Sequence, residues 1–342
     1  MYTIEEEKVH VIPVDFNVFF NNAKEYKNKI RYSPECIISE SFFSELCQYI
    51  IACKEDEIVA IDMKGVASYP TRLFSKLEKN LSKIVFFNVE RDKVQRQLTE
   101  DLDNLDWIDD TVGFYSEKTD WEIKTLLESY CANARRKEIK RIVNQISLNE
   151  NGRIQYLDSS GLYSNCYVDI KKLFINVNDY YYILFCLAEK VSMQIQKRQI
   201  DAFISSSKNG AIIANILGGM LDIKEIHLLG VGPRYSMELG DSLESIKKGK
   251  KYAYIFDFMC TGTELKIASA LVNSKRAYLD YAAGIAKYKR KEESTNIDTI
   301  EVLFYTNEME KEFRLVGDAK DLMQGGSINE RVQEAALYRE NE

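Results

Sequence analysis

A chain of 342 residues, with 45% hydrophobic and 29% charged residues, has the size and composition of a soluble globular protein of two domains. Its net charge of −7 does not favour broad nucleic-acid binding, and only 4 prolines and 16 glycines argue against long linkers. No apolar run approaches the roughly 18 residues that a membrane-spanning helix needs, so we expect no membrane partner.

The seven cysteines show no Cys-x-x-Cys spacing. An odd number of cysteines in apolar segments is typical of reduced, buried thiols in a cytosolic protein. The N-terminal residues contain neither a basic nor an apolar region, so we expect no signal peptide and a cytoplasmic location. The two histidines, His10 and His227, are each alone in an apolar context, which disfavours a histidine-based metal site.

The first third of the chain alternates between predicted strands and predicted helices. Hydrophobic periodicity predicts strands at 8–14, 58–62 and 84–89, and helices at 40–53, 71–81 and 91–105. This order predicts a small α/β domain over residues 1–112.

Residues 58–66 and 83–89 resemble the strands of a STAS domain in their order and in the types of residue that they contain. In that family the turn after the first of these strands often carries a phosphorylated serine. Here the corresponding run includes Ser68, Thr71 and Arg72, and the Asp-Ser-Ser-Gly signature is absent. The resemblance therefore implies packing or binding of a protein partner through residues 1–112, without a phosphorylation switch. A generic α/β domain is the alternative.

Residues 119–147 are predicted to form one long helix, capped by Thr119 and Asp120. We interpret a basic cluster on this helix as a solvated face rather than a nucleic-acid site; it comprises Arg135, Arg136, Lys137, Lys140 and Arg141. The run Asn-Glu-Asn-Gly at 149–152 is the clearest boundary in the chain. We therefore expect a helical connector over 113–150 and a second domain over 151–342, with an accessory C-terminal segment.

The second domain is organised around residues 252–264. Five aromatic, aliphatic or alanine residues at 252–256 predict a strand buried on both faces, with Asp257 near its carboxyl end. The small polar run 260–263 follows, and a helical pattern begins at once. Backbone N–H groups at such a helix N-terminus favour a phosphate, and an acid before them can accept hydrogen bonds from sugar hydroxyls.

Three motifs in this order resemble those of the type I phosphoribosyltransferases, and of orotate phosphoribosyltransferase most closely, over about residues 120–290. The resemblance implies a parallel-sheet phosphoribosyltransferase fold. It implies a nucleobase site near Ser160, Gly161, Ser164 and Tyr167, and a pyrophosphate loop at Ser206, Ser207, Lys208, Asn209 and Gly210. It also implies that Asp257 binds the ribose hydroxyls and that the 5′-phosphate binds at Cys260, Thr261, Gly262 and Thr263.

The same resemblance implies Mg²⁺ held by phosphoribosyl pyrophosphate, with Asp257 as the protein group that contacts it, and homodimers as in many family members. Two departures from the family pattern concern catalysis. Phe256 stands where the first acid of the signature is expected, and residues 232–241 lack the lysines of the mobile hood loop. Arg234 is the cation in that segment, so Asp257 and Arg234 are the candidate catalytic residues.

Two functions follow from this pattern. One is an enzyme that transfers ribose 5-phosphate to a base-like acceptor. The other is a catalytically degenerate sensor that binds phosphoribosyl pyrophosphate or a nucleotide and acts on a protein partner, as a regulatory or bacterial defence system would require. Cys260 at a helix N-terminus is either a reactive thiol or a supplier of its backbone N–H; the backbone role is the interpretation that we favour.

Overall fold

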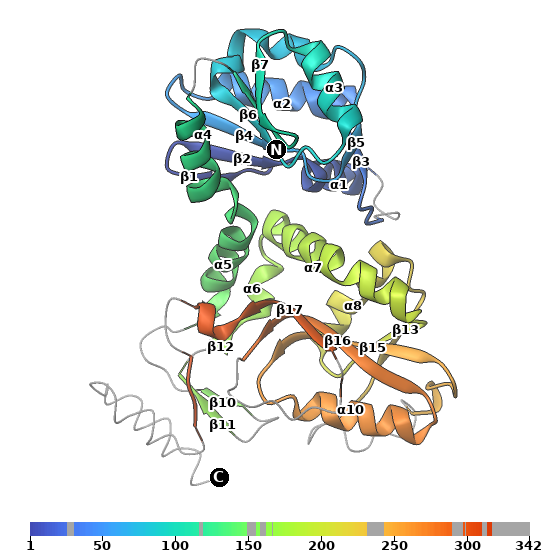
Figure 1. Ribbon diagram of the computed structural model, residues 1–342. Coiled ribbons are helices and arrows are strands. Elements are labelled where there is room, and N and C mark those ends of the chain that lie inside the picture. The colour runs from blue at the N-terminus through green and yellow to red at the C-terminus, as the bar shows by residue number, and fades with distance from the viewer. Residues whose placement is uncertain are drawn as a thin grey trace, which may run out of the picture. The chain divides into compact units, whose positions relative to one another are not determined.

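The computed structural model describes residues 1–25, 31–115, 119–148, 155–157, 162–165, 167–230, 243–288, 297, 299–309 and 313–316 (Figure 1). Contacts divide the chain into two compact units, Met1–Glu138 and Ile139–Glu342. The boundary lies within helix α5 (Ala134–Ile146), so the first part of the expected connector belongs to the first unit. None of the described helices is both long enough and apolar enough to cross a membrane.

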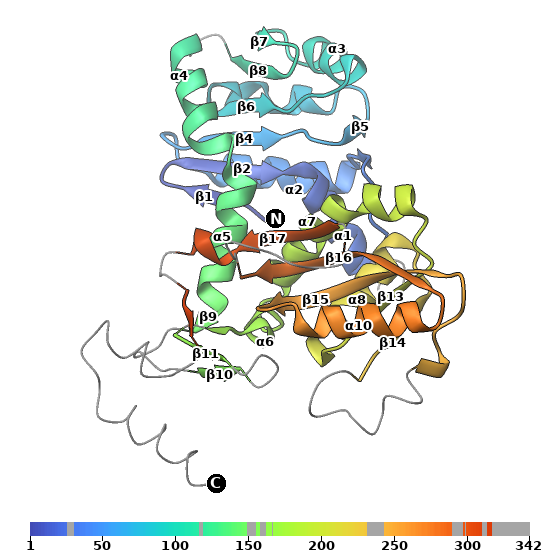
Figure 2. The same cartoon turned by 60° about the horizontal axis from the view of Figure 1, so that its bottom comes forward.

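The first unit is a six-stranded mixed sheet with helices packed on it. Its strands are β1 (Ile4–Glu6), β2 (Val9–Pro13), β4 (Ile58–Asp62), β6 (Ile84–Phe87), β7 (Leu105–Asp109) and β8 (Val112–Tyr115). They follow the order β1-β2-β4-β6-β8-β7, which Figure 2 shows from one edge to the other. Strands β2, β4 and β6 are parallel, and the remaining pairings in this sheet are antiparallel.

The helical segments of the first unit are α1 (Val14–Glu25), α2 (Glu40–Ala52), η1 (Phe74–Lys83), α3 (Asp92–Asp101), α4 (Asp120–Leu126), η2 (Leu127–Cys131) and the start of α5. A short parallel pair, β3 (Cys36–Ile37) and β5 (Val66–Ser68), completes it. The three predicted strands and the predicted helices at 40–53 and 91–105 correspond to β2, β4, β6, α2 and α3. The region expected as a helix at 71–81 is a 3₁₀ helix, η1, and α1 and β7–β8 were not expected.

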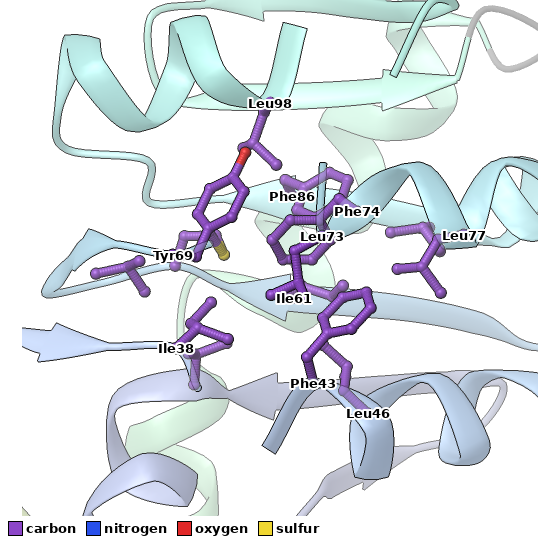
Figure 3. Packing of buried hydrophobic residues seen from close by; sticks show 14 of the residues in the cluster. Ile38, Phe43, Leu46, Ile61, Tyr69, Leu73, Phe74, Leu77, Phe86 and Leu98 are labelled. Atoms are coloured by element: carbon purple, nitrogen blue, oxygen red, sulfur yellow. The ribbon is translucent and has the colours of Figure 1, made fainter. Parts of the chain in front are cut away.

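Aromatic side chains fill the core between this sheet and its helices. Phe74 of η1 is fully buried and meets the rings of Phe43, Tyr69 and Phe86 edge-on, at centroid distances of 5.0, 4.8 and 5.3 Å (Figure 3). Edge-to-face contacts of this kind add stabilisation beyond the burial of area. Phe74 therefore joins α2, η1 and β6 in one cluster.

The expected single helix over 119–147 is interrupted. Thr119 caps α4 through a capping box with Glu122. A π-helical turn, η2, follows at Leu127–Cys131, and α5 starts at Ala134. The apolar stripe seen in the sequence continues through the interruption, which is why periodicity alone suggests one helix.

Arg135 departs from the solvated face expected for the basic cluster. Its guanidinium lies between two buried carboxylates, with Nε 2.9 Å from Asp62 Oδ2 and a terminal nitrogen 2.8 Å from Asp15 Oδ1. Asp62 also accepts hydrogen bonds from Asn88 Nδ2 at 2.9 Å and from the Lys64 amide at 3.2 Å. Asp62 ends β4, and Asp15 lies in the first turn of α1, just after the adjacent parallel strand β2. Arg135 therefore neutralises two acids that the parallel pairing of β2 and β4 brings together.

Cys36 and Cys131 are buried thiols in the first unit, whereas Cys47 and Cys53 are partly exposed. Burial raises the pKa of the Cys36 and Cys131 thiols to about 12. Thiols with such pKa values carry almost no thiolate at neutral pH and are chemically inert.

The second unit is built on a five-stranded, all-parallel sheet with the order β14-β13-β15-β16-β17. The strands are β13 (Ala202–Ser205), β14 (Glu225–Leu228), β15 (Lys251–Met259), β16 (Tyr278–Lys287) and β17 (Thr299–Tyr305). Helices α7 (Val177–Arg198) and α8 (Lys208–Leu221) cover one face, and α10 (Thr263–Ser274) covers the other (Figure 1). The predicted strand at 252–256 is the buried centre of β15.

Shorter elements complete the described part of this unit. They are β9 (Ser147–Leu148), β10 (Gln155–Leu157), β11 (Leu162–Ser164), β12 (Tyr167–Val168), α6 (Ile170–Leu173), η4 (Thr306–Glu308) and β18 (Leu315–Val316). Strands β10, β11 and β18 form one small sheet, and β9 pairs with β12. The alternation of parallel strands and helices on both faces confirms the α/β class expected from the sequence.

We predict that Arg135→Ala lowers the free energy of unfolding of the first unit by about 3–5 kcal/mol, because two buried carboxylates lose their counter-charge. The Arg135 side chain is only 19% exposed, and those of Asp15 and Asp62 are 10% and 3% exposed. Both tryptophans, Trp107 and Trp121, lie in this unit, so tryptophan fluorescence during urea unfolding of the full chain reports on it.

The matched control is Arg136→Ala, which removes the same charge from an exposed position one residue later on α5. Its effect should stay within about 0.5 kcal/mol. Equal losses of stability for the two variants would show that the buried ion pairs do not stabilise the unit.

Candidate functional site

The parallel sheet of the second unit reverses its strand order between β13 and β15. The chain enters at β13, places β14 on one side of it, and then continues through β15, β16 and β17 on the other side. In open α/β sheets, ligands bind outside the carboxyl ends of the strands at such a reversal. Since Ile204 pairs with Tyr254, the residues after β13 and the end of β15 lie at this same edge.

Ser207 connects the two predicted ligand-binding loops. As the N-cap of α8, its hydroxyl accepts a hydrogen bond from the Gly210 amide at 2.9 Å, and it donates one to Asp257 Oδ1 at 3.2 Å. Lys208, Asn209 and Gly210 therefore form the first turn of α8, where the sequence suggested a loop. The predicted pyrophosphate residues and the predicted ribose acid are thus adjacent.

Gly210 is required by close packing in this turn. A Cβ atom at residue 210 would lie 2.3 Å from Ser205 Oγ, 2.9 Å from Ser207 Oγ and 3.1 Å from the Ile255 carbonyl oxygen. The absence of a side chain lets the first turn of α8 lie directly against β15.

The run 260–263 leads from β15 into α10. Gly262 adopts a left-handed conformation, with φ of 71°, and occupies the N-cap position of α10 without offering a capping side chain. The hydroxyls of Thr261 and Thr263 lie 2.9 Å apart at the exposed start of the helix. The helix N-terminus therefore presents backbone donors and two hydroxyls together, as an anion site requires.

Glu264 and Tyr254 are site residues that the sequence analysis did not identify. The Ser206 hydroxyl is hydrogen-bonded to the phenol oxygen of Tyr254 and to the carboxylate of Glu264, in the first turn of α10. Burial raises the pKa of Glu264, and the nearby charge of Asp257 raises it further, whereas the hydrogen bond from Ser206 lowers it. Burial likewise raises the pKa of the Tyr254 phenol.

Phe256 fills space on the face of β15 opposite to Asp257. Its side chain is 4% exposed and stacks beside Tyr254 at a centroid distance of 6.2 Å. A Cβ atom at Gly284 of β16 would lie 2.3 Å from the Phe256 ring. The Phe256 ring therefore packs directly on the backbone of Gly284 in the neighbouring strand. Position 256 is a packing position in this protein.

The other described residues of the predicted site, Ser164 and Tyr167, lie in short strands outside the five-stranded parallel sheet. Ser164 is fully buried in β11, and Tyr167 lies in β12. Ser160, Gly161 and Arg234 fall outside the described residues. Among the residues that the structure describes, no three His, Cys, Asp or Glu side chains are grouped to hold a metal ion.

We predict that Gly210→Ala destabilises the second unit by about 1–3 kcal/mol, because a new methyl group overpacks the contact between α8 and β15. Gly219→Ala, in the same helix, is the matched control, since a Cβ atom there meets nothing within 4 Å. It should stabilise the helix by about 0.5–1 kcal/mol. Pulsed proteolysis of the full chain in urea measures both; a loss of stability in the control alone would contradict the packing assignment.

We predict that Glu264→Gln raises the free energy of unfolding at pH 7. The folded pKa of Glu264 lies above its ordinary value of 4.5, so the folded protein is destabilised once this carboxyl ionises. Glutamine has the same shape and does not ionise, so its advantage should shrink as pH falls through the raised pKa and towards 4.5. Urea unfolding at a series of pH values measures this difference, and an advantage independent of pH would refute it.

The sequence matches no protein-family model and no curated protein. Among solved structures it is similar to an orotate phosphoribosyltransferase from Aeropyrum pernix, with 17% identity over 51% of this chain and 95% of that chain, at a TM-score of 0.36. It is similar to a purine phosphoribosyltransferase from Pyrococcus horikoshii, with 17% identity over 37% and 84% of the two chains, at a TM-score of 0.30.

A third similarity, to the UMP synthase of Leishmania donovani, covers 80% of this chain and 55% of that one, with 10% identity and a TM-score of 0.39. Two of these three structures are phosphoribosyltransferases by name, and none of the three is named as a STAS domain. At these identities and TM-scores the likenesses carry no assignment. The functional inference below depends on the strand order and on the residues at the carboxyl edge of the sheet.

Proposed function

We propose that the second unit binds a phosphorylated ribose, either phosphoribosyl pyrophosphate or a nucleotide. The observation that carries this proposal is the hydrogen bond from Ser207 to Asp257, at the point where the strand order reverses. It brings a helix N-terminus, which suits a phosphate, next to a carboxylate, which suits ribose hydroxyls. A ribose phosphate carries both groups on one small molecule.

Each loop has a role in this proposal. The first turn of α8 receives a diphosphate through the backbone N–H groups of Lys208 and Asn209 and through the Lys208 side chain, while the Gly210 N–H is held by the Ser207 hydroxyl. The run 260–263 receives the 5′-phosphate, with the hydroxyls of Thr261 and Thr263 as further donors. Asp257 accepts hydrogen bonds from the ribose hydroxyls. Its carboxylate also fits Mg²⁺, which proteins usually hold by one or two carboxylates together with the phosphates of the ligand.

Phe256 supports a binding function with little turnover. In a transferase of this type, two consecutive acids would hold the ribose hydroxyls through the transition state, and losing one electrostatic contact to a transition state costs about 2.7–4 kcal/mol. The buried ring packed on Gly284 leaves no such acid at position 256. A sensor that acts on a protein partner through the first unit is therefore the function that we favour; transfer to a base-like acceptor is the second candidate, supported by the retained Asp257.

We predict that ribose 5-phosphate binds the full chain and that Gly262→Val weakens this binding at least about tenfold, or about 1.4 kcal/mol. Valine strains the left-handed conformation of residue 262 and disturbs the N-terminus of α10. Isothermal titration calorimetry measures the affinity. Gly249→Val is the matched control, because Gly249 has a similar φ of 78° in open space before β15.

The preference for ribose over 2-deoxyribose and the transfer activity are tested with the same samples. Ribose 5-phosphate should bind more tightly than 2-deoxyribose 5-phosphate, because only ribose offers Asp257 both hydroxyls. Wild-type protein incubated with phosphoribosyl pyrophosphate, Mg²⁺ and a panel of bases should release little pyrophosphate. Equal weakening by the two glycine variants would refute the phosphate site, and rapid pyrophosphate release would establish the transferase instead.

A further inference from the structure

The Ser206 hydroxyl, in the predicted pyrophosphate loop, already forms hydrogen bonds with two side chains of this protein, Tyr254 and Glu264. A serine hydroxyl has one hydrogen to donate and two lone pairs to accept with. An ionised Glu264 carboxylate can only accept, so Ser206 donates its hydrogen to Glu264 and accepts one from the Tyr254 phenol. The side chain of Ser206 is 4% exposed. A ligand phosphate therefore finds no hydrogen on Ser206 while Glu264 holds it.

The Glu264 carboxylate also lies at the positive N-terminal end of α10, where a ligand phosphate would be stabilised. It lies in the first turn of α10, directly after the run 260–263, where the positive end of the helix dipole stabilises a negative charge. Asp257 is close enough to act on the charge of Glu264. A bound phosphate monoester, with a charge of about −1.5 to −2 near pH 7, would be repelled by both carboxylates.

We propose that Glu264 is a specificity-determining residue: it is a built-in anion that competes with the ligand phosphate for Ser206 and for the N-terminus of α10. This inference rests on the proposed function of the site. It means that the protein holds phosphorylated ribose more weakly than its loops alone would allow, and that neutralising or displacing Glu264 strengthens binding. A protein with this arrangement responds only to high concentrations of its ligand, which suits a sensor.

The decisive comparison uses two variants that differ in charge. Glu264→Gln keeps the length of the side chain and an acceptor for Ser206 but removes the charge, whereas Glu264→Asp keeps the charge. Calorimetric titration of the full chain with ribose 5-phosphate at pH 7.5 should show about tenfold tighter binding by the Gln variant, as expected for one nearby like charge. The Asp variant should bind about as weakly as the wild type.

Ribose without phosphate serves as the second ligand. Its affinity should change little in Glu264→Gln, because an uncharged sugar is not repelled by the carboxylate. If Glu264→Gln binds ribose 5-phosphate no more tightly than wild type, the inference is wrong while the proposed function stands. If ribose gains as much as ribose 5-phosphate, the effect is not competition between anions and the inference is also wrong. If wild type and both variants all fail to bind ribose 5-phosphate, the proposed function fails as well.

Discussion

The parallel pairing of β13 with β15 is the constraint on which the second unit depends. Two strands that are far apart in the sequence become neighbours, and the helices that follow them, α8 and α10, leave towards opposite faces of the sheet. Their N-termini therefore converge at one edge. The hydrogen bonds that join the two loops, from Ser207 to Asp257 and from Ser206 to Glu264, follow from this arrangement.

Close packing at that edge leaves little freedom in the choice of residues. Gly210 lies against the serines and the β15 backbone, and Gly284 lies against the Phe256 ring. These two glycines act in different ways. Gly210 lets the helix N-terminus approach the sheet, whereas Gly284 makes room for the Phe256 ring. The same sheet thus combines a closely approaching helix N-terminus with an aromatic side chain packed into the core.

Buried charge is handled differently in the two units. In the first unit, Asp15 at the start of α1 and Asp62 at the end of β4 share the guanidinium of Arg135, so their charges are compensated within the protein. In the second unit, Asp257 and Glu264 accept hydrogen bonds from Ser207 and Ser206, and neither acid forms an ion pair within the part of the chain that the structure describes. Burial raises the pKa of Glu264. Compensated acids are typical of structure, and uncompensated ones are typical of a site whose charge has a function.

The sequence by itself determined the local elements and the chemistry of the loops. Hydrophobic periodicity located β2, β4, β6, α2, α3 and β15, because each has a continuous apolar pattern of the right period. The resemblance of the motifs selected Ser207, Gly210 and Asp257, which the fold then brought together. Only the tertiary structure decided that Arg135 turns inward, that Phe256 packs on Gly284 and that Glu264 holds Ser206. These contacts join residues 58 or more positions apart, or neighbouring strands, and no local pattern encodes such distances.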